Sequence, residues 1–260
     1  MKNLLIDALR LSGGLLLEYF NRPLDIKYKG SQSSIVTEAD LASDRMIVDR
    51  IRKSFPLHNI ISEESGLTDN GSEFTWVIDP LDGTSNFASG IPWFGVMIAV
   101  LKNNRPVMGG AYLPVEDKLF FAGAGKGAFR NGEPLVMPAK RDMKDSLVAF
   151  CMDHTLDAAF FSRGIDMYRK VVERSRNIRS TNSLVDFLFV AEGKFGGVIN
   201  LNTKIWDIAA LSLIIAEAGG VFKNAGGNDI EFSVDEKILQ EVFPVIAGPA
   251  GMVEFLAGAE

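Results

Sequence analysis

The pattern of apolar and polar positions predicts two amphipathic helices at the start of the chain. Apolar side chains recur at helical spacing through residues 1–20, and the helix is expected to end near Asn21-Arg22-Pro23. A second helix is expected from about Ala39 to Phe55. Thr37, followed three residues later by Asp40, is typical of the capping box that begins a helix.

Short apolar segments between turn-forming residues then predict a series of strands. They are Asn59–Ser62, Phe74–Ile78, Phe94–Leu101, Val107–Leu113, Lys118–Ala122 and Ala128–Phe129. The turn residues Asn131-Gly132 favour further antiparallel pairing after them.

The pattern changes after the polar stretch Pro138–Ser146. Strands are expected at Leu147–Cys151, Arg176–Arg179 and Phe243–Gly248, and helices at about 157–175, 183–193 and 206–218. Antiparallel strands followed by alternating strands and helices favour a layered α+β protein. We therefore predict an N-terminal α+β subdomain over residues 1–143, with an antiparallel sheet and most candidate ligands, and an α/β subdomain over 144–260.

Composition and charge narrow the possible partners. The chain has 260 residues and a net charge of −6, without a run of Lys and Arg, which argues against a nucleic acid substrate. No stretch reaches the roughly 20 apolar residues that span a bilayer, so no membrane partner is expected. Cys151 is the only cysteine and cannot form an intrachain disulfide. These features favour a cytoplasmic protein, with Cys151 as a small core residue.

The segment Trp76-Val-Ile-Asp-Pro-Leu-Asp-Gly-Thr-Ser-Asn-Phe87 carries the clearest chemistry. An apolar strand is expected to lead into a loop that holds Asp79 and Asp82. Two carboxylates three residues apart, on a turn stiffened by Pro80, can point at one centre, and hard oxygen ligands of this kind suit Mg²⁺. A turn with an N-cap would also explain both aspartates.

The residues that follow predict a phosphate seat. Gly83 lets the backbone approach a ligand closely. A helix is expected to begin at about Ser85, so the backbone N–H groups of Gly83, Thr84 and Ser85 can face an anion.

Other acidic residues lie at the ends of expected elements, where ligand sites gather. Glu63 and Glu64 follow a strand whose antiparallel pairing with the next one could bring them to the Asp79 loop. Asp40 and Asp44 lie one turn apart at the start of a helix, where interaction with the helix dipole is the alternative explanation.

Asp207 is the fourth such position. It directly follows Trp206 at the start of an apolar helix, where an N-cap role is the alternative explanation.

Three blocks of this sequence resemble the inositol monophosphatase family of Mg²⁺-dependent, lithium-sensitive phosphatases. They are Ser62-Glu-Glu-Ser-Gly66, the segment Trp76–Phe87, and Trp206-Asp-Ile-Ala-Ala-Leu-Ser-Leu-Ile-Ile-Ala-Glu-Ala-Gly-Gly220. Val36–Asp40 and Lys126–Gly132 are similar to two weaker family blocks. The resemblance covers nearly the whole chain in the family's order.

The resemblance implies a fold and an activity. The fold is a layered αβαβα sandwich of the inositol monophosphatase and fructose-1,6-bisphosphatase type, usually as a homodimer. The activity is hydrolysis of a small phosphate monoester by a water molecule that two or three Mg²⁺ ions activate. No protein nucleophile is required.

The resemblance also implies the ligand sets. Glu63, Asp79 and the carbonyl of Leu81 match the ligands of the first metal. Asp79, Asp82 and Asp207 match those of the second metal.

The same comparison implies catalytic residues. Asp40, with Glu63 and water molecules, matches the outer shell of a weaker third metal. Thr84 matches the residue that orients the attacking water, and together with Gly83 it matches the phosphate contacts.

Substrate contacts are expected from the C-terminal half. Asn200 stands where inositol-specific members carry a glutamate that holds a substrate hydroxyl, and Thr181-Asn182-Ser183 replaces a Gly-Thr-Ala-like run. We expect Asn182, Ser183, Asn200 and Asp207 to line the substrate site, together with Gly83, Thr84 and Ser85.

Several substrates remain open at this point. The leading hypothesis is inositol monophosphate or a related sugar or polyol phosphate. The same chemistry would also serve fructose 1,6-bisphosphate, histidinol phosphate or 3′-phosphoadenosine 5′-phosphate. An alternative of another class is a regulatory binding protein on the same scaffold, which engages RNA polymerase or ribosomal partners.

Overall fold

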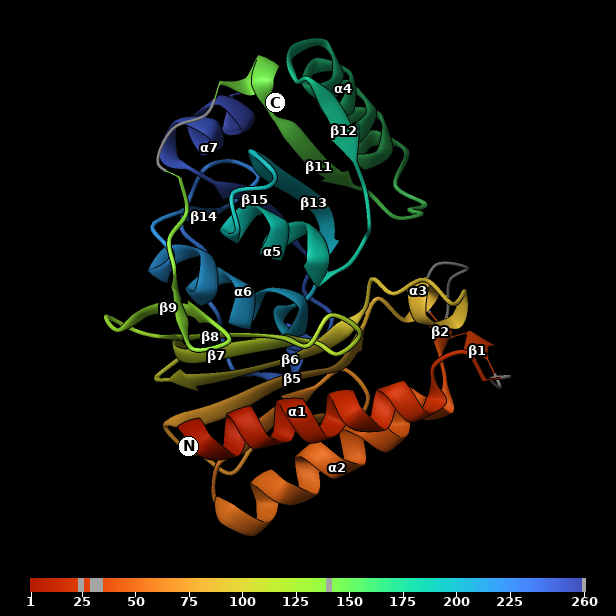
Figure 1. Ribbon diagram of the computed structural model, residues 1–260, viewed down its shortest axis with the longest axis vertical. Helices are drawn as coiled ribbons and strands as arrows, with labels where there is room; N and C mark the ends of the chain where they lie inside the picture. Colours follow the sequence, from red (N-terminus) through yellow and green to blue (C-terminus); the bar gives the residue numbers. More distant parts are fainter. Residues whose placement is uncertain (23–25, 29–34, 139–141, 259–260) are drawn as a thin grey trace.

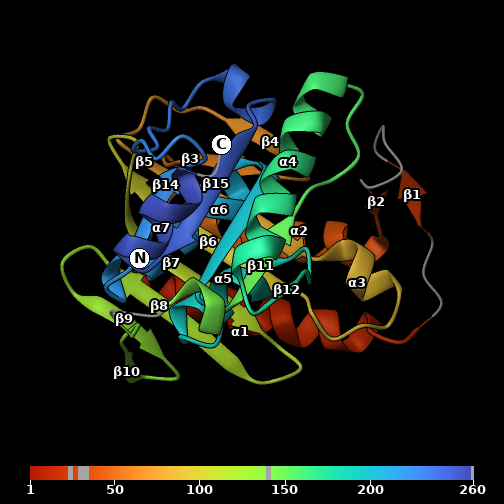
Figure 2. The same ribbon diagram turned by 90° about the horizontal axis from the view of Figure 1, so that it is seen from above.

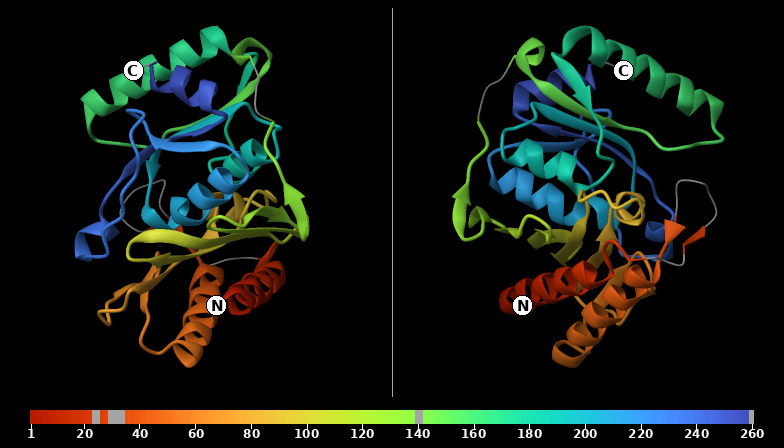
Figure 3. Two further views of the ribbon diagram at one scale, coloured as in Figure 1. Left: turned by 90° about the vertical axis from the view of Figure 1, so that its left-hand side faces the viewer. Right: turned by 45° about the vertical axis from the view of Figure 1, so that its right-hand side comes forward.

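The computed structural model describes residues 1–22, 26–28, 35–138 and 142–258 of the chain. Within these residues it forms five layers in the order helix, sheet, helix, sheet, helix (Figures 1 and 3). The N-terminal helices cover the outer face of the first sheet, and the C-terminal end lies beyond the second sheet (Figure 1). The expected layered sandwich is confirmed.

The first layer consists of α1 (Lys2–Tyr19) and α2 (Glu38–Ser54), as the sequence pattern predicts. Pro23, at the expected end of the first helix, lies outside the described residues. The capping box at the start of α2 is present: the Asp40 carboxylate accepts from the Thr37 N–H at 2.8 Å, and the Thr37 hydroxyl accepts from the Ala39 N–H at 3.2 Å. This cap fixes the Asp40 side chain, which is only 1% exposed, in the first turn of α2.

The first sheet has eight strands. In spatial order they are β10 (Glu133–Leu135), β9 (Gly127–Arg130), β8 (Lys118–Gly123), β7 (Arg105–Leu113), β6 (Gly95–Lys102), β5 (Phe74–Asp82), β3 (Asn59–Ser62) and β4 (Gly66–Thr68). The turn at Asn131-Gly132 has φ values of 51° and 87°, as the sequence predicts for a tight hairpin. A separate ribbon of β1 (Lys27–Tyr28) and β2 (Ile35–Val36) lies near α3 (Thr84–Ala88) (Figure 1).

Two expectations for the first sheet are wrong. β3 and β5 pair in parallel, with Ser62 opposite Ile78, whereas the sequence analysis expected antiparallel pairing. Parallel pairing places the carboxyl ends of both strands at one edge, so Glu63 follows β3 beside Asp79. In addition, Asp79 and Asp82 do not lie in a loop, because β5 continues through both residues.

The second sheet has five strands, in the order β12 (Asn177–Arg179), β11 (Leu147–Cys151), β13 (Gly197–Thr203), β15 (Phe243–Gly248) and β14 (Val221–Asn224). The pairs that β11 makes are parallel and the pairs that β15 makes are antiparallel. Two short 3₁₀ helices precede strands of this sheet: Met143–Asp145 comes before β11, and Glu236–Leu239 comes before β15. Its outer face is covered by α4 (Ala158–Arg174) and α7 (Ala250–Ala257), which Figure 2 shows above the sheet.

Two strands and one α-helix of this half are not predicted by the sequence pattern. β13 follows a glycine-rich turn and carries polar residues at alternate positions, such as Asn200 and Asn202. A stretch of this composition is also typical of a loop, so the strand was not predicted. β14 and α7 are short and lie at the edge of the fold. The predicted boundary at Pro138–Ser146 lies between the last strand of the first sheet and the first strand of the second. Residues 139–141 of this stretch fall outside the described ones. The division into two subdomains remains a prediction.

The middle layer consists of α5 (Leu184–Ala191) and α6 (Ile205–Glu217). α6 contacts β5 to β9 on one side and β14 and β15 on the other. A helix between two sheets is apolar around most of its circumference, which explains the continuous apolar run in α6. This layer carries Asp207 from the C-terminal half to the edge of the first sheet. Among the described helices, none has both the length and the apolar surface that a bilayer crossing requires.

α1 packs very closely on the first sheet at Gly13. A Cβ atom at this position would lie 2.4 Å from a ring carbon of Tyr112 on β7. The next residue, Gly14, would place its Cβ with no atom within 4 Å. The two adjacent glycines therefore differ in their packing role.

We expect Gly13→Ala to reduce the free energy of unfolding by about 1–3 kcal/mol, because the added methyl group overpacks the interface with Tyr112. Gly14→Ala is the matched control and should raise stability by up to about 1 kcal/mol, because alanine has the higher helix propensity. Urea unfolding of the two variants measures both effects, and equal stabilities would contradict this account of the interface.

Candidate metal centre

Two carboxylates of β5 meet a third from the start of α6, more than a hundred residues later in the chain. Asp79, Asp82 and Asp207 each offer an oxygen, and these oxygens all lie within 4.8 Å of one another. The β5–β6 register shifts between Asp79 and Asp82, which marks a bulge. Residues three apart in a regular strand face opposite sides, so the bulge allows both aspartates to face one centre.

Each carboxylate is held by a backbone N–H. The donors are Leu81 to Asp79 at 3.1 Å, Leu184 to Asp82 at 2.5 Å, and Lys204 to Asp207 at 2.6 Å. Asp207 is therefore not the N-cap that one reading of the sequence suggested: Lys204 precedes the helix, and Asp207 lies in its first turn. These bonds fix the carboxylates while leaving their remaining oxygens available to a cation.

Burial and neighbouring carboxylates raise the pKa of all three groups. Burial, followed by the charges of Glu63, Asp82 and Asp207, raises the pKa of Asp79 well above its ordinary value. Burial raises the pKa of Asp82 to about 7, although the hydrogen bond from the Leu184 N–H lowers it. Burial, followed by the charge of Asp82, raises the pKa of Asp207 to about 8. Such a cluster favours either protons or cations, since desolvated carboxylates repel each other.

Glu63 lies outside the group of three but lines the same cavity. Its position depends on Asp44 of α2, whose carboxylate accepts hydrogen bonds from Ser62 and, at 3.3 Å, from Ser65. Asp44 is only 5% exposed, so it anchors the end of β3 and does not simply complement the helix dipole. The backbone N–H of Glu63 donates to Ile78 at 3.2 Å, next to Asp79.

Asp40 reaches the site through Thr84. The Thr84 hydroxyl lies 3.0 Å from a carboxylate oxygen of Asp40 and 3.0 Å from the carbonyl of Leu81. Gly83 precedes α3 with φ of 81°, and a Cβ there would meet the Trp93 carbonyl at 2.6 Å, so only glycine fits this turn. Asp40 itself does not line the cavity.

A cavity of about 370 Å³ opens beside these groups. Its lining includes the expected residues Glu63, Asp79, Leu81, Asp82, Gly83, Thr84, Ser85, Asn182 and Asp207. A smaller cavity of about 90 Å³ shares Asp82, Asn182 and Asp207 with this lining, and its own lining includes the expected residues Ser183 and Asn200. The structure thus brings the candidate residues together around two cavities that share lining residues, and Asp40 contacts the site through Thr84.

Some lining residues were missed by the sequence analysis. Asp153 and His154 follow β11, and Asn202 and Lys204 lie on or just after β13. The alternation of Asn200 and Asn202 was an available signal, because alternate residues of a strand share one face.

Asp186 was also missed, although Ser183-x-x-Asp186 has the form of a capping box. Its fully buried carboxylate accepts from the backbone N–H groups of Thr181 and Asn182 at 3.0–3.2 Å. The Cys151 thiol lies 3.1 Å from the same carboxylate. Burial raises the pKa of Cys151, so the thiol stays protonated in the core, as expected from the sequence.

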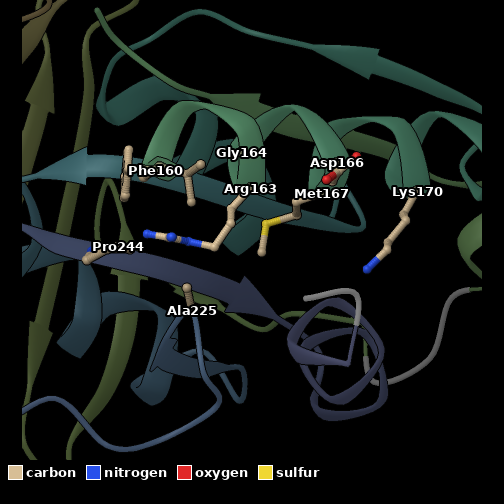
Figure 4. Close-up of a pocket in the computed structure, with 9 residues that line it drawn as sticks. Phe160, Arg163, Gly164, Asp166, Met167, Lys170, Ala225 and Pro244 are labelled. Atoms are coloured by element: carbon tan, nitrogen blue, oxygen red, sulfur yellow. The ribbon is translucent and has the colours of Figure 1, made fainter. Parts of the chain in front are cut away.

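Another cavity, of about 510 Å³, lies beneath α4 (Figure 4) and shares no described lining residue with the first one. Met167, Leu201 and Ala225 contribute apolar atoms to its lining, and Arg163 and Lys170 extend from α4 beside it (Figure 4). Asp166 is the one carboxylate among its described lining residues. A metal-dependent reaction therefore finds its ligands in the first cavity.

Known proteins give an independent comparison. A Haemophilus influenzae protein named "Nus factor SuhB" is 37% identical over 229 residues, which cover 85% of this chain and 84% of that protein. An Aquifex aeolicus protein named "Fructose-1,6-bisphosphatase/inositol-1-monophosphatase" is 34% identical over 220 residues, 83% of each chain. The crystal structure of extragenic suppressor protein suhB from Bartonella henselae aligns with a TM-score of 0.89 at 30% identity, over 99% of this chain and 97% of that one.

A model of the inositol monophosphatase family matches residues 1–253. The match runs through both sheets and includes every carboxylate of the cluster. With relatives above 30% identity over more than four fifths of their length, this chain belongs to the inositol monophosphatase family.

Proposed function

We propose that the protein is a Mg²⁺-dependent phosphomonoesterase that hydrolyses inositol monophosphate or a related sugar or polyol phosphate. The observation that carries the proposal is the convergence of Asp79, Asp82 and Asp207 within 4.8 Å. Family membership supports hydrolase chemistry and dependence on Mg²⁺. The resemblance further supports a cytoplasmic homodimer, which analytical ultracentrifugation and cell fractionation can measure.

The residues fit a hard divalent cation. The donors are carboxylate oxygens, the ligand type that Mg²⁺ prefers. Their raised pKa values indicate that the protein's own cationic side chains do not offset the negative charge of the cluster, so a bound cation would stabilise it. Asp79, Asp82 and Asp207 would hold one ion, and Glu63, Asp79 and the Leu81 carbonyl a second.

The protein's own groups have distinct tasks in this proposal. Bound Mg²⁺ would supply an activated water and neutralise phosphate charge. The N–H groups of Gly83, Thr84 and Ser85 would hold phosphate oxygens. The Thr84 hydroxyl, fixed between Asp40 and Leu81, would orient the attacking water.

A second candidate function comes from the names of relatives. The Haemophilus influenzae relative is named a Nus factor, which favours a regulatory binding role on the same scaffold. A binding role does not require Asp79, Asp82 and Asp207 to converge in a cavity. We therefore place hydrolysis first and treat regulation as compatible with it.

We expect Asp82→Asn to lower kcat/KM for inositol 1-phosphate by more than roughly 100-fold, because changes around metal ligands already cost about 10–100-fold. Asp49→Asn, at an exposed carboxylate on α2, is the matched control and should retain activity. Phosphate release with Mg²⁺, and again in EDTA, measures both. Activity that persists in EDTA would refute the metal-dependent mechanism.

We expect Mg²⁺ to bind at least about tenfold more weakly at pH 6 than at pH 8.5, because protons on Asp82 and Asp207 compete with it. The stability of the metal-free protein should change with pH in the opposite direction. The pKa values of Asp82 and Asp207 are raised in the folded state, so the folded protein binds more protons than the unfolded chain. The free energy of unfolding therefore falls as the pH rises through these pKa values of about 7 and about 8. Isothermal titration and thermal unfolding at several pH values test this, and a pH-independent affinity would contradict it.

A further inference from the structure

We infer that Ser43 and Asp44 of α2 are positioning residues for one metal ion, the ion that Glu63, Asp79 and the Leu81 carbonyl would hold. Neither serine nor aspartate is among the described residues that line the cavity, so each acts through a backbone segment that it binds. The inference deepens the proposed function and rests on it, because it concerns the cation site of that function. It assigns a task in metal binding to the outer helical layer.

The bulge in β5 leaves two buried residues outside the strand ladder. β5 pairs with β6 at Asp79 and again at Asp82, and its pairing with β3 ends at Ile78. Pro80 and Leu81 therefore have no paired residue on either neighbouring strand, although both are buried. A buried backbone carbonyl without a partner is costly, so these carbonyls need donors from elsewhere in the fold.

Ser43 supplies the donor for the first of these carbonyls. Its hydroxyl donates to the Pro80 carbonyl at 2.7 Å, and its oxygen lies 2.5 Å from the hydroxyl oxygen of Ser12 on α1. A hydroxyl group carries one proton, so Ser12 is the donor and Ser43 the acceptor in the second bond. Both serines are fully buried. Two hydroxyls from two helices thus hold this carbonyl from the outer face of the sheet.

The bond from Ser43 fixes the peptide unit that joins Pro80 to Leu81. That unit is planar, and the proline ring restricts the backbone just before it. Its N–H group, on Leu81, donates to the Asp79 carboxylate at 3.1 Å. Ser43 and Asp79 therefore bind the two polar groups of one rigid unit. The Leu81 carbonyl follows directly and lies beside the cavity, where it accepts from Thr84 at 3.0 Å.

Asp44 holds the segment that carries the other ligand. A single oxygen of its carboxylate accepts from the hydroxyls of Ser62 and, at 3.3 Å, of Ser65. These serines lie on either side of Glu63, whose backbone N–H donates to the Ile78 carbonyl at 3.2 Å. Adjacent residues of α2 therefore anchor both chain segments that provide ligands for this ion.

The second ion depends on other anchors. Asp82 accepts from the Leu184 N–H at 2.5 Å, and Asp207 accepts from the Lys204 N–H at 2.6 Å. Both donors come from the C-terminal half of the chain, and neither belongs to α2. Loss of the α2 contacts should therefore weaken one ion much more than the other.

The test is the number and affinity of ions bound per chain. Isothermal titration with Mg²⁺ measures the affinities, and electron paramagnetic resonance with Mn²⁺, which accepts the same oxygen ligands, counts the ions. Ser43→Ala and Asp44→Ala should each weaken one of the two ions by about tenfold or more, the usual effect of removing a group that orients a ligand. The other ion should keep its affinity to within about threefold.

Ser12→Ala is the matched control for Ser43→Ala. It removes one buried hydroxyl of the same pair but leaves the bond from Ser43 to the Pro80 carbonyl. Its thermal midpoint should therefore fall, while both ions keep their wild-type affinity. This control separates a general loss of stability from a loss of positioning.

Asp44→Asn separates hydrogen bonding from charge. Asparagine keeps a side-chain oxygen that accepts from Ser62 and Ser65, so this variant should retain the ion that Asp44→Ala weakens. Asp49→Ala, at an exposed carboxylate of the same helix, should leave both ions unchanged.

A double-mutant cycle identifies the ion concerned. In a Glu63→Gln background, Asp44→Ala should weaken Mg²⁺ binding no further, because Asp44 acts through Glu63. In an Asp207→Asn background, which impairs the second ion, Asp44→Ala should keep its full effect.

The outcomes are distinguishable. Unchanged ion affinities in both Ser43→Ala and Asp44→Ala overturn the inference. Equal weakening of both ions, reproduced by Ser12→Ala, also overturns it, and so does an Asp44→Asn variant as impaired as Asp44→Ala. A wild-type chain that shows the expected ion binding but releases no phosphate from inositol 1-phosphate or other monoesters overturns the proposed function alone. A wild-type chain that binds no divalent cation overturns both.

Discussion

Desolvated carboxylates repel one another, and the architecture of this protein is arranged to hold several of them together. Burial is the largest cause of the raised pKa values of Asp79, Asp82 and Asp207, and the charge of Asp82 adds to it at both Asp79 and Asp207. Folding them together is unfavourable unless protons or cations reduce the charge. The surrounding architecture must therefore hold these groups against a force that separates them.

Two kinds of anchor provide that hold. Within the N-terminal half, buried polar groups tie the helical layer to the first sheet: Ser43 of α2 donates to the Pro80 carbonyl at 2.7 Å, and Asp44 holds the end of β3. Between the halves, the Leu184 N–H donates to Asp82 and Asn86 donates to Thr181. The middle helix layer completes the connection, because α6 touches both sheets and carries Asp207.

The same arrangement divides the cavity into two chemically different walls. One wall comes from the first sheet and α3, with carboxylates and backbone N–H groups suited to metal and phosphate. The other comes from the loop after β11, the turn at Asn182 and β13, with neutral amides and one carboxylate, Asp153. The family match runs through both walls.

The pattern of residues alone predicts the layered α+β architecture, both long N-terminal helices, the capping box at Thr37 and the carboxylates of the segment Trp76–Phe87, since these depend on local periodicity and on residue type. It also indicated the family, because its motifs are contiguous. Three features become visible only in the folded molecule: β3 runs parallel to β5, a bulge turns Asp79 and Asp82 to one centre, and Asp153 and Asn202 line the same cavity. Strand direction, register and the meeting of loops depend on packing between distant segments, and no local pattern in the chain records that packing.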